Sequence, residues 1–388
     1  MQRDVLLGRR IVLDLLVNAS NLHVGGGIQV AASFIEEMSR WEVRSHRIGM
    51  LVSDEVHENL LRIGCNVSVF SRYEVYNTYG LSSLKASWQG KFDGYDVVFT
   101  IFGPAYFLTQ RFVSVVGFAQ AWIIYPDNEA ALEFSWPTRW RLRIKYWLQS
   151  IFLKRADRLI VEAEHVKAGL ISSKISSAGS VDIVPNCISM LYFEPEKWSP
   201  LLKEIPRSKA LRIGYVGRDY PHKNLNCLPE IKCLLSEHYG VDVEFYVTFS
   251  DEEWARRSGF FRTHVNNVGV LDVSQCPSFY QCLDAVIFPS LVECFSATPL
   301  EAMVMGKPVF ASDRSFVSGV CGELIEYFNP LDPADMAKMI FSYFNVDQLE
   351  RDKRLVAARA YAAEFSSART RALRYVEILE DALHFSRR

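Results

Sequence analysis

Two carboxylates with a defined spacing stand in residues 289–313, PSLVECFSATPLEAMVMGKPVFASD. Glu293 lies in a polar stretch that follows an apolar run, and that run predicts a buried strand of a parallel sheet. Thr298 as N-cap, proline at the first helical position and Glu301 at the third predict a helix start. A loop carboxylate can accept hydrogen bonds from sugar hydroxyls, and a carboxylate one turn into a helix can reach a ribose diol. The predicted helix start also offers free N–H groups to a phosphate.

These residues therefore meet the demands of a nucleotide diphosphate sugar at the carboxyl end of a parallel strand, where open α/β sheets bind ligands. A second interpretation stays open on spacing alone. Glu301 could serve only as the capping partner of Thr298, and Glu293 could be a solvated loop acid.

Two cations follow another predicted strand, 211–217. Arg218 and Lys223 lie on the short polar turn GRDYPHKN. Together they could clamp a diphosphate, with the arginine as a planar fork and the lysine as a point charge. The alternative is that both are ordinary surface cations.

A glycine triplet, Gly25, Gly26 and Gly27, separates a predicted strand at 10–17 from a predicted helix over 28–38. Such a turn lets the backbone approach a phosphate or a sugar closely. The spacing is not the G-x-G-x-x-G of a dinucleotide site, so NAD binding has little support. The alternative is a merely flexible turn.

Composition bounds the class of protein. The 388 residues suggest two domains, and 49% hydrophobic with 23% charged residues is typical of a globular protein. A net charge of -2 gives no indication of nucleic-acid binding. The eight cysteines lack C-x-x-C spacing, which predicts reduced thiols in the cytoplasm. Residues 1–10 lack the apolar region of a signal peptide. No Asp-x-Asp lies in a suitable loop, so we expect no metal.

The segment 138–155 carries six cations and no acids. Trp140, Ile144, Trp147 and Ile151 recur at helical spacing on one face. This pattern suits a helix on an anionic membrane surface. It equally suits a core helix with a charged outer face, and the sequence leaves both open.

Strands alternate with helices along the whole chain, which predicts an α/β protein with parallel sheets. The first domain is expected to end at residue 200 and the second to cover 201–370, with 189–209 as a linker. A last helix, 371–388, is long enough to return to the first domain. The predicted strands are 10–17, 48–53, 67–70, 97–102, 113–119, 158–161, 181–184, 211–217, 243–249, 267–271, 284–288 and 309–311.

The motif set resembles the retaining GT-B glycosyltransferases of family four, the glycosyl transferases group 1. The residues that carry the resemblance are GR…HKN at 217–224, the Pro185-Asn186 pair, and PSLxExFxxxPLEAMxxGxPVxASD at 289–313. The likeness is strong in the second domain and loose in the first. It implies two Rossmann-like domains whose sheets face a central cleft, with a C-terminal helix crossing back to the first domain.

The resemblance also implies residue roles. Arg218 and Lys223 would hold the donor diphosphate, Glu293 would touch the donor sugar and Glu301 would hold the ribose. The resemblance thus implies three catalytic residues, Glu293, Arg218 and Lys223. The expected donor-binding set is Glu301, Ser296, Ala297, Thr298, Leu300, Gly25, Gly26, Gly27, Gln120 and Asn186.

Three departures from the family pattern affect the expected chemistry. Cys294 and Ser296 stand where the family usually has glycine, and Cys187 replaces a common glycine after the PN pair. Gln120 lies where the first domain often offers a histidine. Glutamine cannot act as a base near neutral pH, which fits a front-face mechanism in which the departing phosphate helps to deprotonate the acceptor.

The resemblance implies a retaining hexosyltransferase that moves a sugar from a nucleotide diphosphate sugar to a glycan or a polyprenyl-linked glycan. Synthesis of a bacterial surface polysaccharide, O-antigen or capsule, is the expected setting. We expect no cofactor, no metal and no nucleic acid, and a cytoplasmic protein with a peripheral contact to the inner membrane face through 138–155. The alternatives are a nucleotide-sugar epimerase of the same fold and a non-catalytic nucleotide-sugar binding partner.

Overall fold

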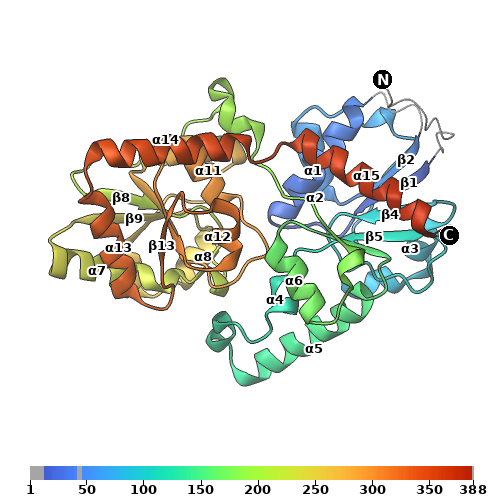
Figure 1. Ribbon diagram of the computed structural model, residues 1–388, viewed down its shortest axis with the longest axis horizontal. Helices are drawn as coiled ribbons and strands as arrows, with labels where there is room; N and C mark the ends of the chain where they lie inside the picture. Colours follow the sequence, from blue (N-terminus) through green and yellow to red (C-terminus); the bar gives the residue numbers. More distant parts are fainter. Residues whose placement is uncertain (1–12, 42–45, 387–388) are drawn as a thin grey trace, which may run out of the picture. The chain divides into compact units, whose positions relative to one another are not determined.

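The structure is a computed structural model that describes residues 13–41 and 46–386 (Figure 1). The expectation for residues 1–10 lies outside the described residues. Contacts divide the chain into two units. Unit 1 takes in the described residues of Met1–Ile124, Leu142–Asn186 and Ala368–Arg388, and unit 2 takes in Tyr125–Arg141 and Cys187–Ser367. Among the described helices, none combines the length and apolar character needed to cross a bilayer.

Unit 1 contains a parallel sheet with the strand order β3-β2-β1-β4-β5-β6-β7 among the described residues. Its strands are β1 (Leu13–Ala19), β2 (His46–Val52), β3 (Arg72–Val75), β4 (Val97–Thr100), β5 (Val113–Gly117), β6 (Arg158–Val161) and β7 (Val181–Ile183). Its helices include α1 (Gly26–Arg40), α2 (Asp54–Arg62), α3 (Ala86–Gln89), α4 (Ala121–Ile124), α6 (Glu164–Ser172) and α15 (Ala368–Ser386). Helix α5 (Trp136–Leu153) contains the boundary between the two units.

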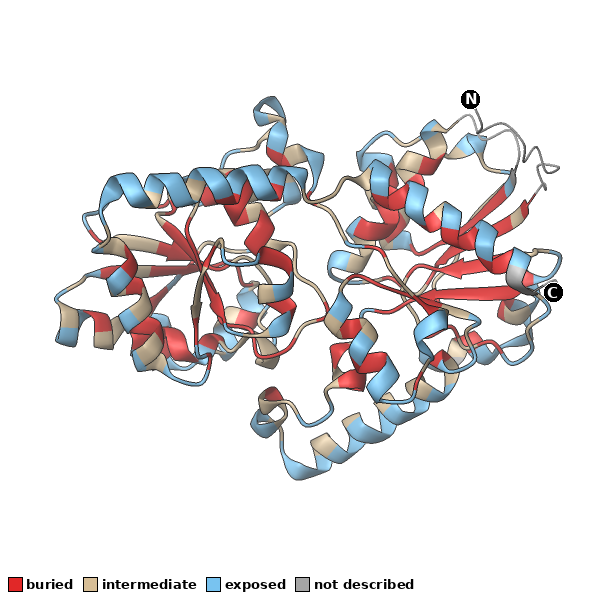
Figure 2. Ribbon diagram, in the orientation of Figure 1, coloured by how far each residue is buried: buried red, intermediate tan, exposed pale blue. Residues whose placement is uncertain are grey.

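Buried apolar strands form the centre of unit 1, as parallel sheets covered by helices require. Strands β4 and β5 are buried throughout (Figure 2). Helix α15 lies along α1 (Figure 1) and buries Tyr375, Ile378 and Leu379 in the same apolar cluster as β1. Helix α15 thus completes the apolar core around β1.

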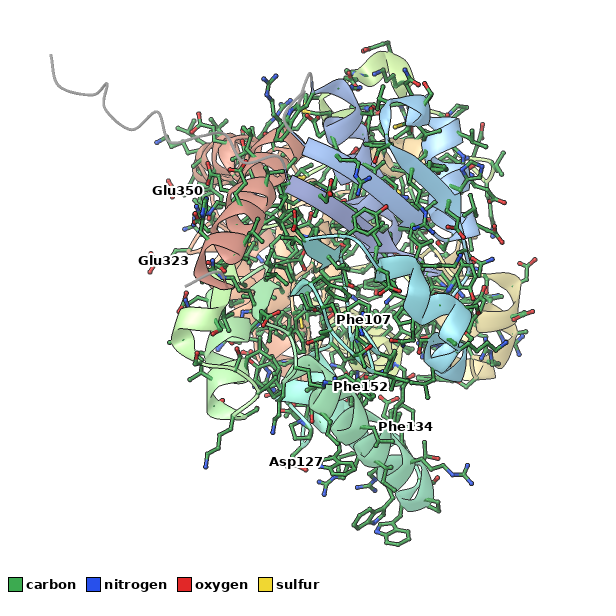
Figure 3. All side chains as sticks on the ribbon, turned by 90° about the vertical axis from the view of Figure 1, so that its right-hand side faces the viewer. Phe107, Asp127, Phe134, Phe152, Glu323 and Glu350 are labelled. Carbon is green, nitrogen blue, oxygen red and sulfur yellow. The ribbon has the colours of Figure 1, made fainter. Side chains whose placement is uncertain are left out.

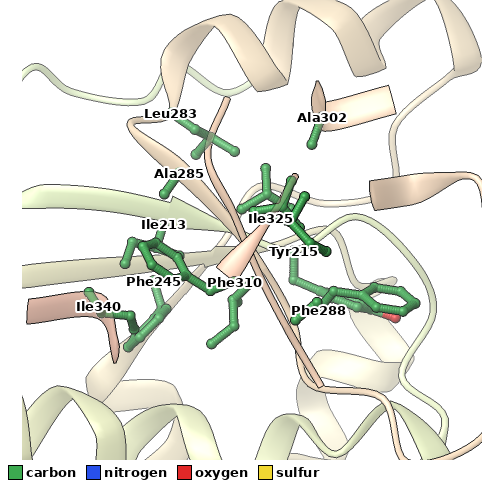
Figure 4. Packing of buried hydrophobic residues seen from close by; sticks show 14 of the residues in the cluster. Ile213, Tyr215, Phe245, Leu283, Ala285, Phe288, Ala302, Phe310, Ile325 and Ile340 are labelled. Atoms are coloured by element: carbon green, nitrogen blue, oxygen red, sulfur yellow. The ribbon is translucent and has the colours of Figure 1, made fainter. Parts of the chain in front are cut away.

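Unit 2 contains a second parallel sheet with the order β10-β9-β8-β11-β12-β13. Its strands are β8 (Leu211–Gly214), β9 (Val243–Val247), β10 (Val265–Asn267), β11 (Ala285–Phe288), β12 (Val309–Ser312) and β13 (Glu326–Phe328). Its helices are α7 (Leu228–Tyr239), α8 (Asp251–Arg256), α9 (Gly259–His264), α10 (Cys276–Cys282), α11 (Thr298–Val304), α12 (Ser315–Cys321), α13 (Pro333–Phe344) and α14 (Gln348–Glu364). Ile213, Phe245 and Phe310 pack together in its core (Figure 4).

Both sheets reverse their strand order at an internal position, β1/β4 in unit 1 and β8/β11 in unit 2. Crevices outside the carboxyl ends of strands at such switch points are where open α/β sheets bind ligands. The loops after β1, β8 and β11 carry the glycine triplet, the two cations and Glu293, so the topology brings the predicted site residues of each unit to its switch point.

Two predicted strands are misplaced. The segment 67–70 is not a strand, because the Asn66 side chain accepts a hydrogen bond from the Ser68 amide and starts a 3-10 turn, Val67–Val69; the strand follows at β3. The strand expected at 267–271 ends at Asn267, whose side chain bonds the backbone of Phe249 and Gly269 and closes the turn.

Residues 189–209, predicted to be a linker, pack on unit 2 instead. Tyr192 is 5% exposed and Ile205 9% exposed within the core of unit 2. The Ser199 amide donates to the Ser274 carbonyl at 2.8 Å, and Lys203 Nζ donates to the Asn267 carbonyl at 2.5 Å. The chain therefore passes from unit 1 to unit 2 at Asn186/Cys187, and the segment assigned to the first domain up to residue 200 packs on unit 2 from residue 187 onward.

Candidate functional site

Lys223 and Glu293 form an ion pair in unit 2 that connects the loop after β8 with the loop after β11. Both side chains are largely buried, at 15% and 12% exposed. Lys223 Nζ also lies 5.3 Å from the ring centroid of Phe288, the last residue of β11. The sequence predicted both residues for one site, and the structure brings them into contact at the switch point.

The backbone of the β8 loop adopts conformations that depend on its residue types. Gly217 has a φ of 144°, and a Cβ there would meet the Tyr215 hydroxyl at 2.7 Å. The Gly217 amide donates to Thr248 Oγ1 at 3.0 Å. Asn224 is left-handed with a φ of 56° and donates to the Pro330 carbonyl at 2.7 Å. Glycine and asparagine are the residues that tolerate such conformations, so they set where Arg218 and Lys223 leave the backbone.

Arg218 is held by an acid that the sequence analysis did not identify. Its Nε donates to Glu253 Oε1 at 2.7 Å, while the arginine side chain remains 53% exposed. Glu253 also accepts from the amides of Asp219 and Ser250. Burial opposes ionisation of Glu253, but the hydrogen bonds from Arg218 and the two amides outweigh it, so its pKa is lowered. The pattern Ser250-x-x-Glu253 is a capping box at the start of α8, a signal visible in the sequence.

A second pair supports the same loop. Arg257 Nε donates to Asp219 Oδ2 at 2.7 Å, and the Arg257 guanidinium lies over the ring of Phe261 at 4.4 Å. A pocket of about 440 Å³ opens here, with Tyr220 and Glu133 in its lining. Because Arg257 is already paired, this pocket mixes charges of both signs and has no evident preference for an anion.

Glu301 is held by two buried tyrosines. Tyr280 donates its hydroxyl to Glu301 Oε2 at 3.2 Å, and Tyr192 forms a further side-chain hydrogen bond with this carboxyl. Burial raises the pKa of Glu301, and the two tyrosine hydrogen bonds partly offset that effect. Tyr192 belongs to the segment expected to be linker, which is why the sequence analysis missed it.

The predicted start of α11 is wrong by one residue. Ala297 is the N-cap, Thr298 is the first helical residue, and no side chain caps the helix. The Glu301 amide bonds the Ala297 carbonyl at 2.8 Å. Glu301 is therefore not the capping partner of Thr298, and its side chain serves the tyrosine network instead. Ser296 and Ala297 are half-buried, and Leu300 is fully buried under the helix.

His222, beside Lys223, is a further neighbour that was not singled out. Burial lowers its pKa to about 4, and Lys223 adds to this effect against the opposing influence of Glu293. The ring stacks on Tyr220 with centroids 5.5 Å apart. His222 is thus neutral near pH 7 and does not add positive charge to the Lys223–Glu293 pair.

The site residues predicted in the first domain lie in unit 1. Gly25 has a φ of 76° and caps α1, which begins at Gly26. Open space surrounds the Cβ positions of Gly25 and Gly26, whereas a Cβ on Gly27 would meet Leu22 and Phe102 at 3.3 Å. Gln120 is half-buried just before α4, and its carbonyl accepts from the Ile123 amide.

Asn186 belongs to a buried polar cluster in unit 1. Its side-chain oxygen accepts from Arg371 of α15, which is 2% exposed and also donates to Ser33 Oγ at 2.5 Å. Burial raises the pKa of the neighbouring Glu162 to about 7, against the lowering influence of Arg371 and of the Asn186 hydrogen bond. The predicted role of Asn186 in donor binding stays a prediction, and the amide oxygen already has a structural partner.

Comparison with known families assigns the part of the chain that carries most of these residues. Residues 210–345 match the sequence model described as glycosyl transferases group 1. This segment is a glycosyl transferases group 1 domain. It contains Arg218, Lys223, Glu293 and Glu301, so the acids and cations of the site belong to one recognised domain.

Two curated proteins that the chain resembles are glycosyltransferases by name. The chain is 24% identical over 201 residues to the capsular polysaccharide biosynthesis glycosyltransferase CapM of Staphylococcus aureus, covering 47% of this chain and 52% of that protein. It is 24% identical over 234 residues to D-inositol 3-phosphate glycosyltransferase of Paenarthrobacter aurescens, covering 56% of each. The chain thus spans about half the length of the curated relatives it matches.

Solved structures show that the fold is that of GT-B glycosyltransferases. HepE of Anabaena, solved in complex with UDP and glucose, superposes with a TM-score of 0.70 at 16% identity, over 95% of this chain and 99% of that chain. A glycosyltransferase of Rickettsia africae superposes with a TM-score of 0.68 at 16% identity, over 95% and 98%. The expected fold of two parallel-sheet α/β domains is confirmed.

Proposed function

We propose that this protein is a retaining, metal-independent glycosyltransferase. It transfers a sugar from a nucleotide diphosphate sugar to a glycan or a lipid-linked glycan, in the synthesis of a bacterial surface polysaccharide. The observation that carries the proposal is the Lys223–Glu293 pair, which connects the β8 and β11 loops at the switch point of a group 1 domain. The UDP and glucose bound to HepE support the class of donor. The name of CapM, a capsular polysaccharide biosynthesis glycosyltransferase, supports the setting.

Catalysis in this proposal is electrostatic. As the glycosidic bond breaks, negative charge grows on the β-phosphate, and Lys223 and the exposed guanidinium of Arg218 stabilise it together with backbone amides near Thr298. Glu293 orients the sugar hydroxyls, and Glu301, held by its tyrosines, binds the ribose. Preorganised donors of this kind cost no reorganisation during the reaction. Because these cations supply the countercharge, we expect activity to persist in a chelator such as EDTA.

Gln120 supports the stereochemical part of the proposal. Gln120 is not a general base near neutral pH, which favours a front-face reaction that retains the anomeric configuration. A lipid-linked acceptor would place the enzyme at the cytoplasmic face of the membrane. Gly25, Gly26 and Gly27 would approach the donor phosphate or the acceptor.

Nucleotide release from a panel of UDP-, GDP- and dTDP-sugars tests the function. Arg218→Ala and Lys223→Ala should each lower turnover about 10²-fold, as loss of one preorganised donor typically does. Glu293→Ala should also lower turnover, because the sugar hydroxyls lose their acceptor. Arg207→Ala, an exposed cation of the same unit, should leave turnover unchanged. Unchanged turnover in the three site variants would refute the assignment.

The same assay separates two other outcomes. An epimerase would interconvert the donor sugar with no acceptor present and release no nucleotide. A non-catalytic partner would bind the donor in calorimetry without turnover.

A further inference from the structure

Helix α5 exposes its largest apolar side chains. Across the helix, Leu153 is the buried residue. Six apolar residues are between 39% and 68% exposed: Trp136, Trp140, Ile144, Trp147, Leu148 and Ile151. We call these six residues the α5 stripe. A core helix would bury such a stripe, so the core interpretation of this segment is wrong.

The stripe faces away from the side on which α5 packs. Half-buried Tyr146 and Gln149, with Leu153, form the packed side. The Tyr146 ring stacks on Trp122 with centroids 6.3 Å apart, and Gln149 donates to the Tyr106 hydroxyl at 3.3 Å. At about 100° of rotation per residue, the stripe spans about 120° on the opposite side. Most of helix α5 has the pale blue of exposed residues in Figure 2, and Figure 3 shows side chains projecting outward from it.

Cations flank the stripe on both sides. At the same rotation per residue, Arg139 and Arg143 precede the stripe around the helix and Arg141 and Lys145 follow it. No acid lies within α5. Two acids of the preceding turn are engaged elsewhere in unit 2, since Glu129 pairs with Arg314 at 2.6 Å and Glu133 accepts from Asn226 at 3.5 Å.

We propose that α5 is an interfacial membrane anchor: the stripe inserts at the boundary between headgroups and acyl chains of a bilayer, and the flanking cations bind anionic phospholipid headgroups. Tryptophan has an apolar ring with one polar N–H and is favoured at this depth, and long cationic side chains reach from an apolar surface to the headgroups. The positive charge beside the stripe favours a lipid surface over a second copy of this chain as its partner. A second copy of α5 packed on the stripe would bring cations against cations, whereas an anionic lipid surface complements them. The anchor would hold the enzyme close to a lipid-linked acceptor, and this consequence rests on the proposed function.

The test uses the full chain without donor, in sedimentation with vesicles of phosphatidylglycerol and phosphatidylcholine. Wild-type protein should bind these vesicles at low salt and release from them as salt rises, and it should bind pure phosphatidylcholine much more weakly. Tryptophan fluorescence should shift to the blue and be quenched by brominated lipid. This optical signal needs no variant and so does not depend on the folding of a mutant.

Matched variants assign the binding to α5. Trp140→Ser, Ile144→Ser and Trp147→Ser combined should lower vesicle binding about tenfold or more. The control combines Leu202→Ser, Leu349→Ser and Val356→Ser, which are 92%, 64% and 70% exposed elsewhere, and should bind like wild type. Arg141→Gln with Lys145→Gln should weaken binding to anionic vesicles, whereas Lys338→Gln with Lys353→Gln should not.

Three results would overturn the inference. The first is that anionic vesicles do not retain the wild-type protein at low salt. The second is that the stripe variant binds vesicles as well as the wild type does. The third is that the protein forms a dimer without lipid in sedimentation velocity, and that this dimer depends on the stripe. Nucleotide release with a soluble acceptor, measured on the same samples, separates the two proposals. Transfer without vesicle binding refutes the anchor alone, and vesicle binding without transfer refutes the proposed function alone.

Discussion

At the scale of single residues, the candidate site holds its charges in pairs. Lys223 is paired with Glu293, and Arg218 with Glu253. The two pairs differ in exposure. Arg218 keeps half of its surface open, so in the proposed function it can add a phosphate to its bonds, whereas Lys223 is largely buried and would have to share its ammonium between Glu293 and the proposed donor. The donor of the proposed function would therefore meet a preformed arrangement.

We predict strong coupling between Lys223 and Glu293 in stability. Either single change to alanine leaves a largely buried charge without its partner, at a cost of about 1–3 kcal/mol. The double variant should cost less than the sum, by about 0.5–3 kcal/mol. Thermal unfolding of the four proteins measures this cycle. The exposed pair Arg374–Glu377, taken through the same cycle, should show no measurable coupling, and equal coupling in both cycles would contradict the prediction.

The raised pKa of Glu162 predicts a defined pH dependence. In the unfolded chain this carboxyl loses its proton near its ordinary pKa, and in the folded protein it keeps the proton up to about pH 7. The folded state binds more protons between these values, so the stability contributed by Glu162 falls as pH rises from about 4.5 to about 7.

Glu162→Gln should therefore flatten the decline of the melting temperature across this pH window. Glu164→Gln, an exposed acid at the start of α6, is the control and should leave the profile unchanged. An identical decline in wild type and Glu162→Gln would show that another group is responsible.

At the scale of elements, the turn after β8 positions the cations. Gly217→Ala forces an L side chain to a φ of 144° and against the Tyr215 hydroxyl. We expect a loss of about 1–3 kcal/mol in stability from backbone strain, together with a loss of turnover because Arg218 is the next residue. Differential scanning calorimetry and nucleotide release measure the two effects. Gly259→Ala, which has open space and begins α9, should be neutral or stabilising.

Helix α15 shows why a C-terminal element matters to the first unit. Leu379 is fully buried and Leu373, on the same helix, is 46% exposed. Leu379→Ala should cost about 2–5 kcal/mol because it removes packed methyl groups and leaves a cavity. Leu373→Ala should change stability by less than about 0.5 kcal/mol. Thermal unfolding of both variants tests the difference.

At the scale of the whole molecule, the chain crosses between the units four times, and its longer excursion leaves unit 1 after Asn186 and returns at Ala368. Arg371 joins the two ends of this longer excursion within unit 1, through a hydrogen bond to Asn186, 185 positions away. Chains with two compact units need not unfold in one step. If two calorimetric transitions are resolved, Leu379→Ala should lower one and leave the other in place, and an equal shift of both would show that the units unfold together.

Much of this arrangement was predictable from local sequence patterns. The strands before the Gly25, Arg218 and Glu293 loops follow from apolar runs bounded by turn residues, and parallel topology then places those loops at the switch points. The capping box that holds Glu253 was equally visible, although its link to Arg218 was not. The prediction of a strand at 67–70 was wrong because the turn capped by the Asn66 side chain outweighed the strand preference of two valines.

The sequence by itself determined which residues are candidates to bind a phosphate and a sugar, because residue type, spacing and strand ends are properties of neighbouring positions. Only the tertiary structure decided which partners they have. Tyr192 reaches Glu301, Arg371 reaches Asn186, and the α5 stripe faces solvent instead of a core. These outcomes depend on packing between segments far apart in the chain, and local periodicity records that a helix has an apolar face but not what lies against it.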